Sequence, residues 1–156
     1  METPQRYRVI AWWSSGKTGL AKSDSAPNAI HFSAPPEFDG LEGRWTPEDL
    51  LLCAVASCYT TTFRVLAEYS KVEYSDLGVE VEGTVRKTDS GYVFSEIVIR
   101  PNLTISGDTE QEAALRLLHK AKAACLVARA LSIPQTFEPR VQMSESRAEV
   151  SQALPQ

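Results

Sequence analysis

The sequence has few cysteines, no cluster of like charges and no segment that would mark it for secretion. Its three cysteines are an odd number at spacings unlike those of a secreted disulfide scaffold, so chemistry, metal binding or core packing must explain them. No basic cluster stands out among the 16 Lys and Arg residues, and the net charge of -4 argues against a nucleic-acid partner. The dispersed charges instead indicate an ordinary solvated surface.

We expect neither an export signal nor a membrane span. The first residues, METPQRYRVIAWW, contain no apolar run preceded by basic residues. We expect no segment to supply the about 20 apolar residues that a bilayer span requires, and we predict a cytoplasmic protein without membrane contact. A hydrophobic content of 43% and a charged content of 23% are ordinary for a globular domain. We predict one domain over residues 1–145 and a mobile polar tail at 146–156.

Several segments predict β-structure. Residues 6–13 and 29–33 are rich in β-branched and aromatic residues and predict two short strands, with a polar loop between them. From Leu77 the apolar residues alternate with polar ones, which predicts a half-buried strand. Asp-Ser-Gly at residues 89–91 predicts the turn of a hairpin, and we expect the second strand of the hairpin to be interrupted near Pro101.

Two long apolar helices are predicted. Thr46 is a good N-cap, Pro47 suits the first helical position, and carboxylates follow in the first turn, so a helix should run from Pro47 to about Ser70. A second helix should begin near Asp108 with a capping box and continue to about Leu131. A last strand is expected over residues 136–143.

This order of elements predicts an α+β fold, because strands and helices are segregated along the chain. Two helices this apolar need more cover than one small sheet provides. We therefore expect a second subunit to supply the rest of the cover, and we predict a homodimer.

The three cysteines lie on these apolar helices. The neighbours of Cys53 offer nothing to activate a thiol, so we interpret Cys53 as a packing residue. Cys58 and Cys125 each lie near the middle of one helix and could meet where the helices pack. Arg129 lies on nearly the same face as Cys125, where its guanidinium could lower the pKa of a thiol. A cation at a helix C-terminus is the ordinary alternative for Arg129.

Polar side chains surround Cys58 inside an otherwise apolar helix. Such side chains indicate that this part of the helix lines a pocket or meets a polar partner. The residues are Ser57, Tyr59, Thr60, Thr61 and Thr62.

A metal site is a competing interpretation, with His119 and the cysteines as ligands. Structural zinc sites usually contain close cysteine pairs with two to four residues between them, whereas Cys53 and Cys58 lie on different faces of one helix. We interpret His119 as a partly exposed helix residue and His31 as a strand residue. No metal is expected.

Glu48 occupies the first turn of the first helix, where a carboxylate complements the helix dipole. A rise of about 1.5 Å per residue places it about 15 Å along the axis from Cys58, so the two side chains cannot touch within one helix. If Glu48 serves a thiol site, that site must be assembled from two subunits.

Three stretches in combination resemble a known family. They are TPEDLLLCAVASCY at residues 46–59, the hairpin segments EVEGTV and YVFSEIVIRPNLTI, and KAKAACLVARAL at residues 120–131. Together they resemble the OsmC/Ohr superfamily, whose members are named for osmotic induction and organic hydroperoxide resistance. The resemblance extends from Val9 to Val141. It implies an antiparallel sheet wrapped around two long central helices in an intertwined homodimer, with two sites at the interface.

The resemblance also implies roles for individual residues. Cys58 matches the peroxidatic cysteine and Cys125 the resolving cysteine. Glu48 matches a glutamate that organises a reactive arginine, but that arginine is replaced here. The Ohr-type position in the turn after the first strand holds Lys17, and the OsmC-type position about ten residues before the glutamate holds Phe38.

Candidate cations for the thiolate are therefore Lys17, Arg44 and Arg129, of which only Lys17 occupies a family position. A lysine supplies charge without the planar bidentate fork of a guanidinium.

The function implied by the resemblance is a thiol-dependent peroxidase. Cys58 would form a sulfenic acid with an organic hydroperoxide and then a disulfide with Cys125, which an external dithiol, such as a lipoylated protein, would reopen. No metal or organic cofactor is implied. Because the family arginine is replaced, two alternatives stay open: a binding protein for a small or lipid-like molecule, and a redox sensor that turns over slowly.

Overall fold

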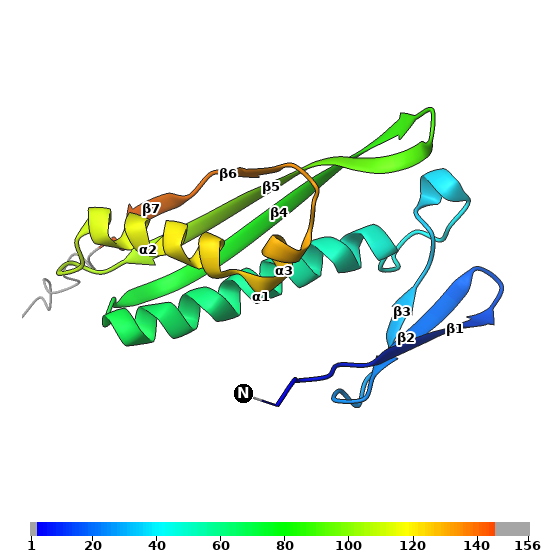
Figure 1. Ribbon diagram of the computed structural model, residues 1–156, viewed down its shortest axis with the longest axis horizontal. Coiled ribbons are helices and arrows are strands. Elements are labelled where there is room, and N and C mark those ends of the chain that lie inside the picture. The colour runs from blue at the N-terminus through cyan, green and yellow to red at the C-terminus, as the bar shows by residue number, and fades with distance from the viewer. Residues whose placement is uncertain (1–2, 146–156) are drawn as a thin grey trace, which may run out of the picture. The chain divides into compact units, whose positions relative to one another are not determined.

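The computed structural model describes residues 3–145 and has an α+β fold made of two compact units, Met1–Leu51 and Leu52–Gln156 (Figure 1). The α+β class predicted from the sequence is therefore confirmed. One domain over residues 1–145 stays a prediction. The predicted tail at 146–156 lies outside the described residues.

The N-terminal unit contains a three-stranded antiparallel sheet in the order β1-β2-β3. The first and third strands were predicted, but the second occupies the segment that was expected to be a polar loop. Gly19 of this missed strand lies opposite Phe32, whose ring leaves no room for a Cβ at this position. The elements are β1 (Val9–Ser15), β2 (Thr18–Ser23), β3 (Ile30–Phe32) and the 3-10 turn η1 (Pro36–Phe38).

The C-terminal unit is built on a long antiparallel hairpin, β4-β5. Two short strands, β6 and β7, pair in parallel with successive parts of β5, so the predicted last strand is two strands. Figure 1 shows helices α1 and α2 running along the hairpin. The elements are α1 (Pro47–Ser70), β4 (Tyr74–Thr88), β5 (Gly91–Ile105), α2 (Gln111–Ala124), α3 (Leu126–Ala130), β6 (Gln135–Phe137) and β7 (Arg140–Met143).

The predicted bounds of α1 are confirmed. Thr46 and Asp49 cap it reciprocally: the Asp49 amide donates to Thr46 Oγ1 at 3.1 Å, and the Thr46 amide donates to Asp49 Oδ2 at 3.0 Å. These bonds satisfy two of the amides that a helix start leaves unpaired. The helix ends at Ser70, and Lys71 follows with a positive φ of 53°.

The hydrophobic core of the C-terminal unit lies between the helices and the hairpin. α1 contributes one stripe of residues at helical spacing, and β5 contributes alternate residues, as expected for a helix packed on a sheet. The fully buried side chains from the helices and β5 include Val55, Tyr59, Phe63, Ile97, Ile99, Leu103, Ile105, Leu118 and Cys125.

The expected interruption near Pro101 is wrong, because β5 continues through it and Pro101 pairs with Val79. Pro101 falls between the part of β5 that pairs with β6 and the part that pairs with β7. Its missing N–H therefore interrupts neither parallel pairing.

The predicted bounds of the second helix are also wrong in two respects. It begins at Gln111 without a side-chain cap, because the Thr109 hydroxyl donates to the Glu73 carbonyl at 3.0 Å instead of capping the helix. It then breaks at Cys125, whose φ of -63° and ψ of 110° are extended, and α3 follows as a separate short helix.

α1 also contradicts the expectation that no segment could span a bilayer, because it is long and apolar enough to do so. The core helix of a folded protein meets the same requirement, so this property alone is weak support for a membrane span. Only 22% of its most apolar window is buried. The rest of that window is partly or fully exposed within the described part of the chain.

Two leucines on α2 should differ sharply in their contribution to stability. Leu118 is fully buried, whereas Leu115 is 38% exposed. We expect Leu118→Ala to lower the free energy of unfolding by about 2–5 kcal/mol, because it removes core contacts and leaves a cavity. Leu115→Ala should lower it by about 1 kcal/mol or less. Urea denaturation followed by circular dichroism measures both values, and equal losses would contradict the described packing of α2.

Candidate functional site

Cys58 lies beside the buried stripe of α1. It is one turn after Val55 and directly precedes Tyr59, two residues that point into the core. Its own side chain is half-buried and packs against the edge of the core. The thiol is thus held by packing on one side and stays accessible on the other.

Cys125 occupies the break between α2 and α3 and is fully buried. Because its backbone is extended, α3 begins immediately after it, and the first amides of a helix have no partner within that helix. The break therefore presents both a thiol and unpaired amides toward α1.

The two thiols meet in the C-terminal unit. The side chains of Cys58 and Cys125 are hydrogen-bonded to each other, and both are free thiols. The contact joins residues 67 positions apart in the sequence, which the packing of α1 against the α2–α3 break brings together.

The environment of Cys58 lowers the pKa of its thiol. Burial acts in the opposite direction, but hydrogen bonds outweigh it: the Val127 amide has the largest lowering effect, followed by the Cys125 thiol, the Thr62 hydroxyl and the Leu126 amide. Each donor favours the thiolate over the thiol. The polar run that contains Thr62 was predictable from the sequence, but the two amides were not, because no local signal predicts the break that exposes them.

The pKa of the Cys125 thiol is shifted in the opposite direction. Burial raises the pKa of its thiol most, and the hydrogen bond and negative charge of Cys58 raise it further, although the Ala128 and Val127 amides act in the lowering direction. Of the two thiols, Cys58 is therefore the one that ionises first, and Cys125 keeps its proton and donates it in the hydrogen bond.

Tyr59 fixes the geometry of the pair. Its ring is fully buried, and its hydroxyl donates to the Leu118 carbonyl at 2.9 Å, which ties α1 to α2. Burial, and next the charge of Cys125, raise the pKa of Tyr59 far above its usual value. Tyr59 therefore stays a neutral donor at any working pH.

The other predicted site residues lie mainly in the N-terminal unit. Lys17 is already paired with Asp39, its ammonium 2.5 Å from the Asp39 carboxylate, and Arg44 is exposed in the bend before α1. Glu48 is half-buried in the first turn of α1, and its Oε2 is shielded from solvent without a hydrogen bond among residues 3–145. A buried carboxylate oxygen without a partner fits a site that awaits a cation.

Arg129 lies on α3, in the same unit as the two thiols, and its side chain is exposed. The largest influences on the pKa of Cys58 are amides, a thiol and a hydroxyl, and none of them is a cation. The thiolate is thus stabilised by neutral donors, which differs from the cation that the sequence suggested.

The remaining candidates lie apart from the thiol pair. Cys53 is exposed rather than a core residue, so its interpretation as packing within this chain is wrong. His119 is exposed on α2 and has an edge contact with the Phe137 ring, and His31 is exposed in β3. Within the described part of the chain, no three His, Cys, Asp or Glu side chains are grouped closely enough to hold a metal ion.

A shallow hollow of about 320 Å³ follows Cys58 along α1. Thr62 lies one turn after Cys58, and Leu66 lies one turn after Thr62. Thr62 is thus one turn from the half-buried thiol and also lines the hollow, which is mainly apolar. Its lining residues are Thr61, Thr62, Val65 and Leu66.

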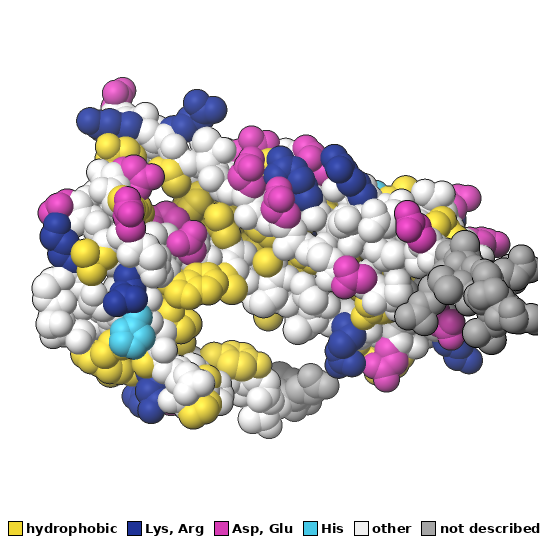
Figure 2. All heavy atoms as spheres, turned by 180° about the vertical axis from the view of Figure 1, so that it is seen from behind, with side chains coloured by type: hydrophobic (Ala, Val, Ile, Leu, Met, Phe, Trp, Pro, Cys, Tyr) yellow, Lys and Arg dark blue, Asp and Glu magenta, His cyan; other side chains and the backbone are white. Residues whose placement is uncertain are grey.

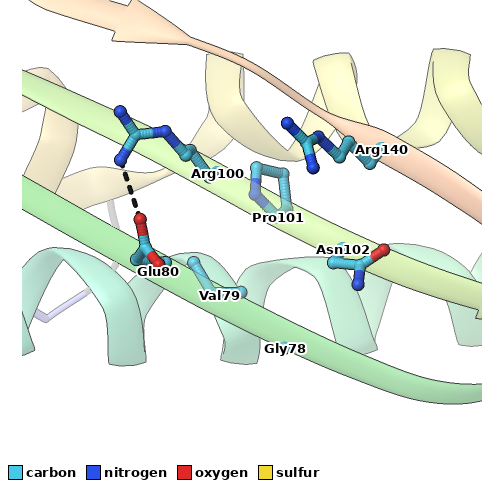
Figure 3. A pocket seen from close by; sticks show the side chains of 7 residues that line it. All are labelled: Gly78, Val79, Glu80, Arg100, Pro101, Asn102 and Arg140. Atoms are coloured by element: carbon cyan, nitrogen blue, oxygen red, sulfur yellow. Dashed lines mark hydrogen bonds and ion pairs between the residues drawn. The ribbon is translucent and has the colours of Figure 1, made fainter.

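A second hollow, of about 550 Å³, lies on the other face of the hairpin (Figure 3). Arg100 points into it because it alternates in β5 with core residues. The Arg100 guanidinium forms ion pairs with two carboxylates, at 2.7 Å from Glu80 Oε1 and 2.9 Å from Glu138 Oε2. This hollow contains no thiol and is separate from the cysteine pair. Its lining residues are Gly78, Val79, Glu80, Arg100, Pro101, Asn102 and Arg140.

Comparison with known proteins places these features in a family. The OsmC-like protein family matches residues 40–140, which include both cysteines and the hairpin. An uncharacterised protein of Bacillus subtilis (strain 168), YmaD, is 30% identical over 128 residues, covering 80% of this chain and 85% of its own.

Solved structures share the fold at low sequence identity. An OsmC-like protein of unknown function from Vibrio cholerae superposes with a TM-score of 0.78 at 18% identity, covering 87% of this chain and 99% of its own. An organic hydroperoxide resistance protein from Elizabethkingia anophelis superposes with a TM-score of 0.73 at 18% identity, covering 92% and 100%. At these identities the structures establish the fold of the chain and nothing finer.

The site predicts how Cys58 responds to pH. Because its pKa is lowered, its alkylation by iodoacetamide should rise with pH through an inflection that lies below that of the same cysteine in the unfolded protein. Mass spectrometry of Cys58-containing peptides after timed alkylation from pH 5 to 10 measures this profile. Buried Cys125 should stay unmodified while the protein is folded. An inflection of Cys58 that is no lower in the folded protein than in the unfolded protein would contradict the described hydrogen bonds.

Proposed function

Because the chain belongs to the OsmC-like protein family, we propose that it is a thiol-dependent peroxidase that reduces organic hydroperoxides. One observation carries the proposal: an accessible thiol of lowered pKa is hydrogen-bonded to a buried thiol on a different segment. A relative in fold is named for organic hydroperoxide resistance, which supports a role with peroxides. The apolar hollow beside Cys58 favours a substrate with a carbon substituent.

In the first step, the Cys58 thiolate attacks the terminal oxygen of the hydroperoxide. A sulfur–oxygen bond forms as the oxygen–oxygen bond breaks, and the alkoxide takes a proton from solvent and leaves as an alcohol. Sulfur is oxidised by two electrons to a sulfenic acid, and the peroxide is reduced by the same two. The lowered pKa of Cys58 supports this step, because the thiolate is the nucleophile.

In the second step, the sulfur of Cys125 attacks the sulfur of the sulfenic acid. A disulfide forms, and the hydroxyl group leaves with the Cys125 proton as water. Oxidation of Cys58 removes the negative charge that raises the pKa of Cys125, so the second thiol loses its proton more readily after the first has reacted. The two thiols are thereby activated in order.

An external dithiol completes the cycle. Its first thiolate attacks the protein disulfide and releases one protein thiol, leaving a mixed disulfide. Its second thiol attacks the mixed disulfide and releases the other protein thiol, so the dithiol leaves as a cyclic disulfide. A lipoyl group is a dithiol of this kind. No metal or organic cofactor takes part in these steps.

Glu48 belongs to the same site in our proposal. Its shielded and unpaired oxygen fits a cation from a second copy of the chain, for which Lys17 and Arg44 are the candidates. Arg129, exposed on α3, is the candidate from the same unit as Cys58. A cation near the thiolate would add to the neutral donors already present.

A homodimer is part of the proposal. Every residue of the edge strand β1 is exposed, including Trp12 and Trp13, and α1 exposes Val65 and Tyr69. Hydrophobic side chains are also visible on the surface in Figure 2. Open strand edges and large exposed apolar side chains are typical of interaction surfaces.

The cysteine variants should separate the two chemical roles. We expect Cys58→Ser to abolish consumption of cumene hydroperoxide, because it removes the nucleophile. Cys125→Ser should form the sulfenic acid and then over-oxidise, because no second thiol traps it. Cys53→Ser is the control and should keep full activity. The measurements are peroxide loss, free-thiol counts and disulfide mapping by mass spectrometry.

Rapid loss of two thiols with a Cys58–Cys125 disulfide is the expected result. Equal peroxide consumption by the wild type and all three variants would remove the peroxidase proposal. Absent thiol loss would instead favour the binding-protein alternative, with the apolar hollow along α1 as the place to look for a ligand.

The dimer should depend on the exposed face of α1. Val65→Glu places a charge on that face and should lower the mass measured by light scattering at micromolar concentration from dimer toward monomer. Ser90→Glu adds the same charge at the exposed hairpin turn and should leave the mass unchanged. A monomer mass for the wild type would refute the dimer.

A further inference from the structure

Three consecutive threonines follow Cys58 on α1, and their hydroxyls differ in what they bond. The Thr60 hydroxyl donates to the Ala56 carbonyl at 2.8 Å. The Thr61 hydroxyl donates to the carbonyls of Ser57 and Cys58, at 3.1 Å and 3.0 Å. These are the usual bonds of a helical threonine to the preceding turn. Both side chains are exposed, and both hydroxyls bond only to the backbone of their own helix.

Thr62 uses its hydroxyl differently. It lies four residues after Cys58, and side chains at this spacing are neighbours on a helix surface. Its hydroxyl is hydrogen-bonded to the Cys58 side chain. Thr62 is half-buried, unlike Thr60 and Thr61, and it lines the hollow along α1 together with Thr61. Thr62 thus both bonds to the Cys58 side chain and lines the hollow.

We propose that Thr62 is a catalytic residue of this site, whose hydroxyl donates to the sulfur of Cys58 and stabilises its thiolate. The proposal rests on the proposed function, because the thiolate is the nucleophile there. A hydroxyl is neutral, so it stabilises the anion only when it is in hydrogen-bond contact with the sulfur. The spacing of one helical turn between Thr62 and Cys58 allows that contact.

The assignment accounts for one member of the polar run, Thr62, as a donor to Cys58. The other donors to Cys58 come from the α2–α3 break, where the Leu126 and Val127 amides lie. Thr62 is the donor contributed by α1 itself. The titratable group that faces Cys58 from the break is Cys125, and Tyr59 lies next to Cys125. Substituting Thr62 leaves these groups in place.

The test compares variants of the full-length protein in which one hydroxyl is removed. Thr62→Val replaces the hydroxyl with a methyl group of similar size, Thr62→Ser keeps the hydroxyl, and Thr60→Val is the matched control. The readouts are the pH profile of Cys58 alkylation by iodoacetamide and the rate of sulfenic acid formation with cumene hydroperoxide. Circular dichroism checks the fold, and Thr62→Ala removes the hydroxyl in a second way.

Thr62→Val and Thr62→Ala should move the alkylation inflection of Cys58 to higher pH. Loss of one bond to a charged group should slow alkylation about tenfold below that inflection. Thr62→Ser and Thr60→Val should keep the wild-type profile, since one retains the donor and the other loses only a bond to the backbone. An unchanged profile in both hydroxyl-free variants would overturn the role of Thr62.

The two readouts separate this inference from the proposed function. A shifted alkylation profile together with slower sulfenic acid formation supports both. A shifted profile in a protein that does not react with the peroxide supports the hydrogen bond to the thiolate and overturns both the peroxidase activity and the catalytic role of Thr62. A shifted profile with unchanged sulfenic acid formation overturns the catalytic role alone.

Discussion

The packing of one stripe of α1 against the α2–α3 segment is the constraint on which the thiol pair depends. Val55, Tyr59 and Phe63 are fully or almost fully buried along that stripe, and the Tyr59 hydroxyl anchors α1 to the Leu118 carbonyl. Cys58 is adjacent to the stripe and therefore has little freedom of position. A thiol hydrogen bond between distant segments requires such rigid support, because sulfur is a weak acceptor whose geometry would otherwise be lost.

The same contact makes two chemically identical side chains different. Cys58 collects amide, hydroxyl and thiol donors, whereas Cys125 is buried next to the resulting negative charge, so their pKa values move in opposite directions. The difference comes from position alone: one thiol lies at the edge of the core and the other within it. An ordered pair of this kind suits sequential chemistry better than two equivalent thiols would, since only one is poised as a nucleophile at a time.

The start of α1 could be predicted from local sequence, but the helix break at Cys125, on which the thiol site depends, could not. The start of α1 was predictable because Thr46, Pro47 and Asp49 each satisfy a backbone requirement of a helix start. The break at Cys125 follows from no proline or glycine, so tertiary packing rather than local propensity determines it. Without the break, the donors at Leu126 and Val127 could not be predicted, and a cation was expected in their place.

Neutral donors and cations stabilise a thiolate in physically different ways. A cation acts over several ångströms and is weakened by salt when exposed, whereas an amide or hydroxyl acts only in contact and is largely unaffected by salt. The donors to Cys58 all come from its own unit, so its lowered pKa is a property of one folded chain. Glu48 presents the opposite case, because its unpaired oxygen lacks a cation among the described residues. Thiolate formation thus needs only the fold of one chain, while any further stabilisation through Glu48 depends on a group brought to it.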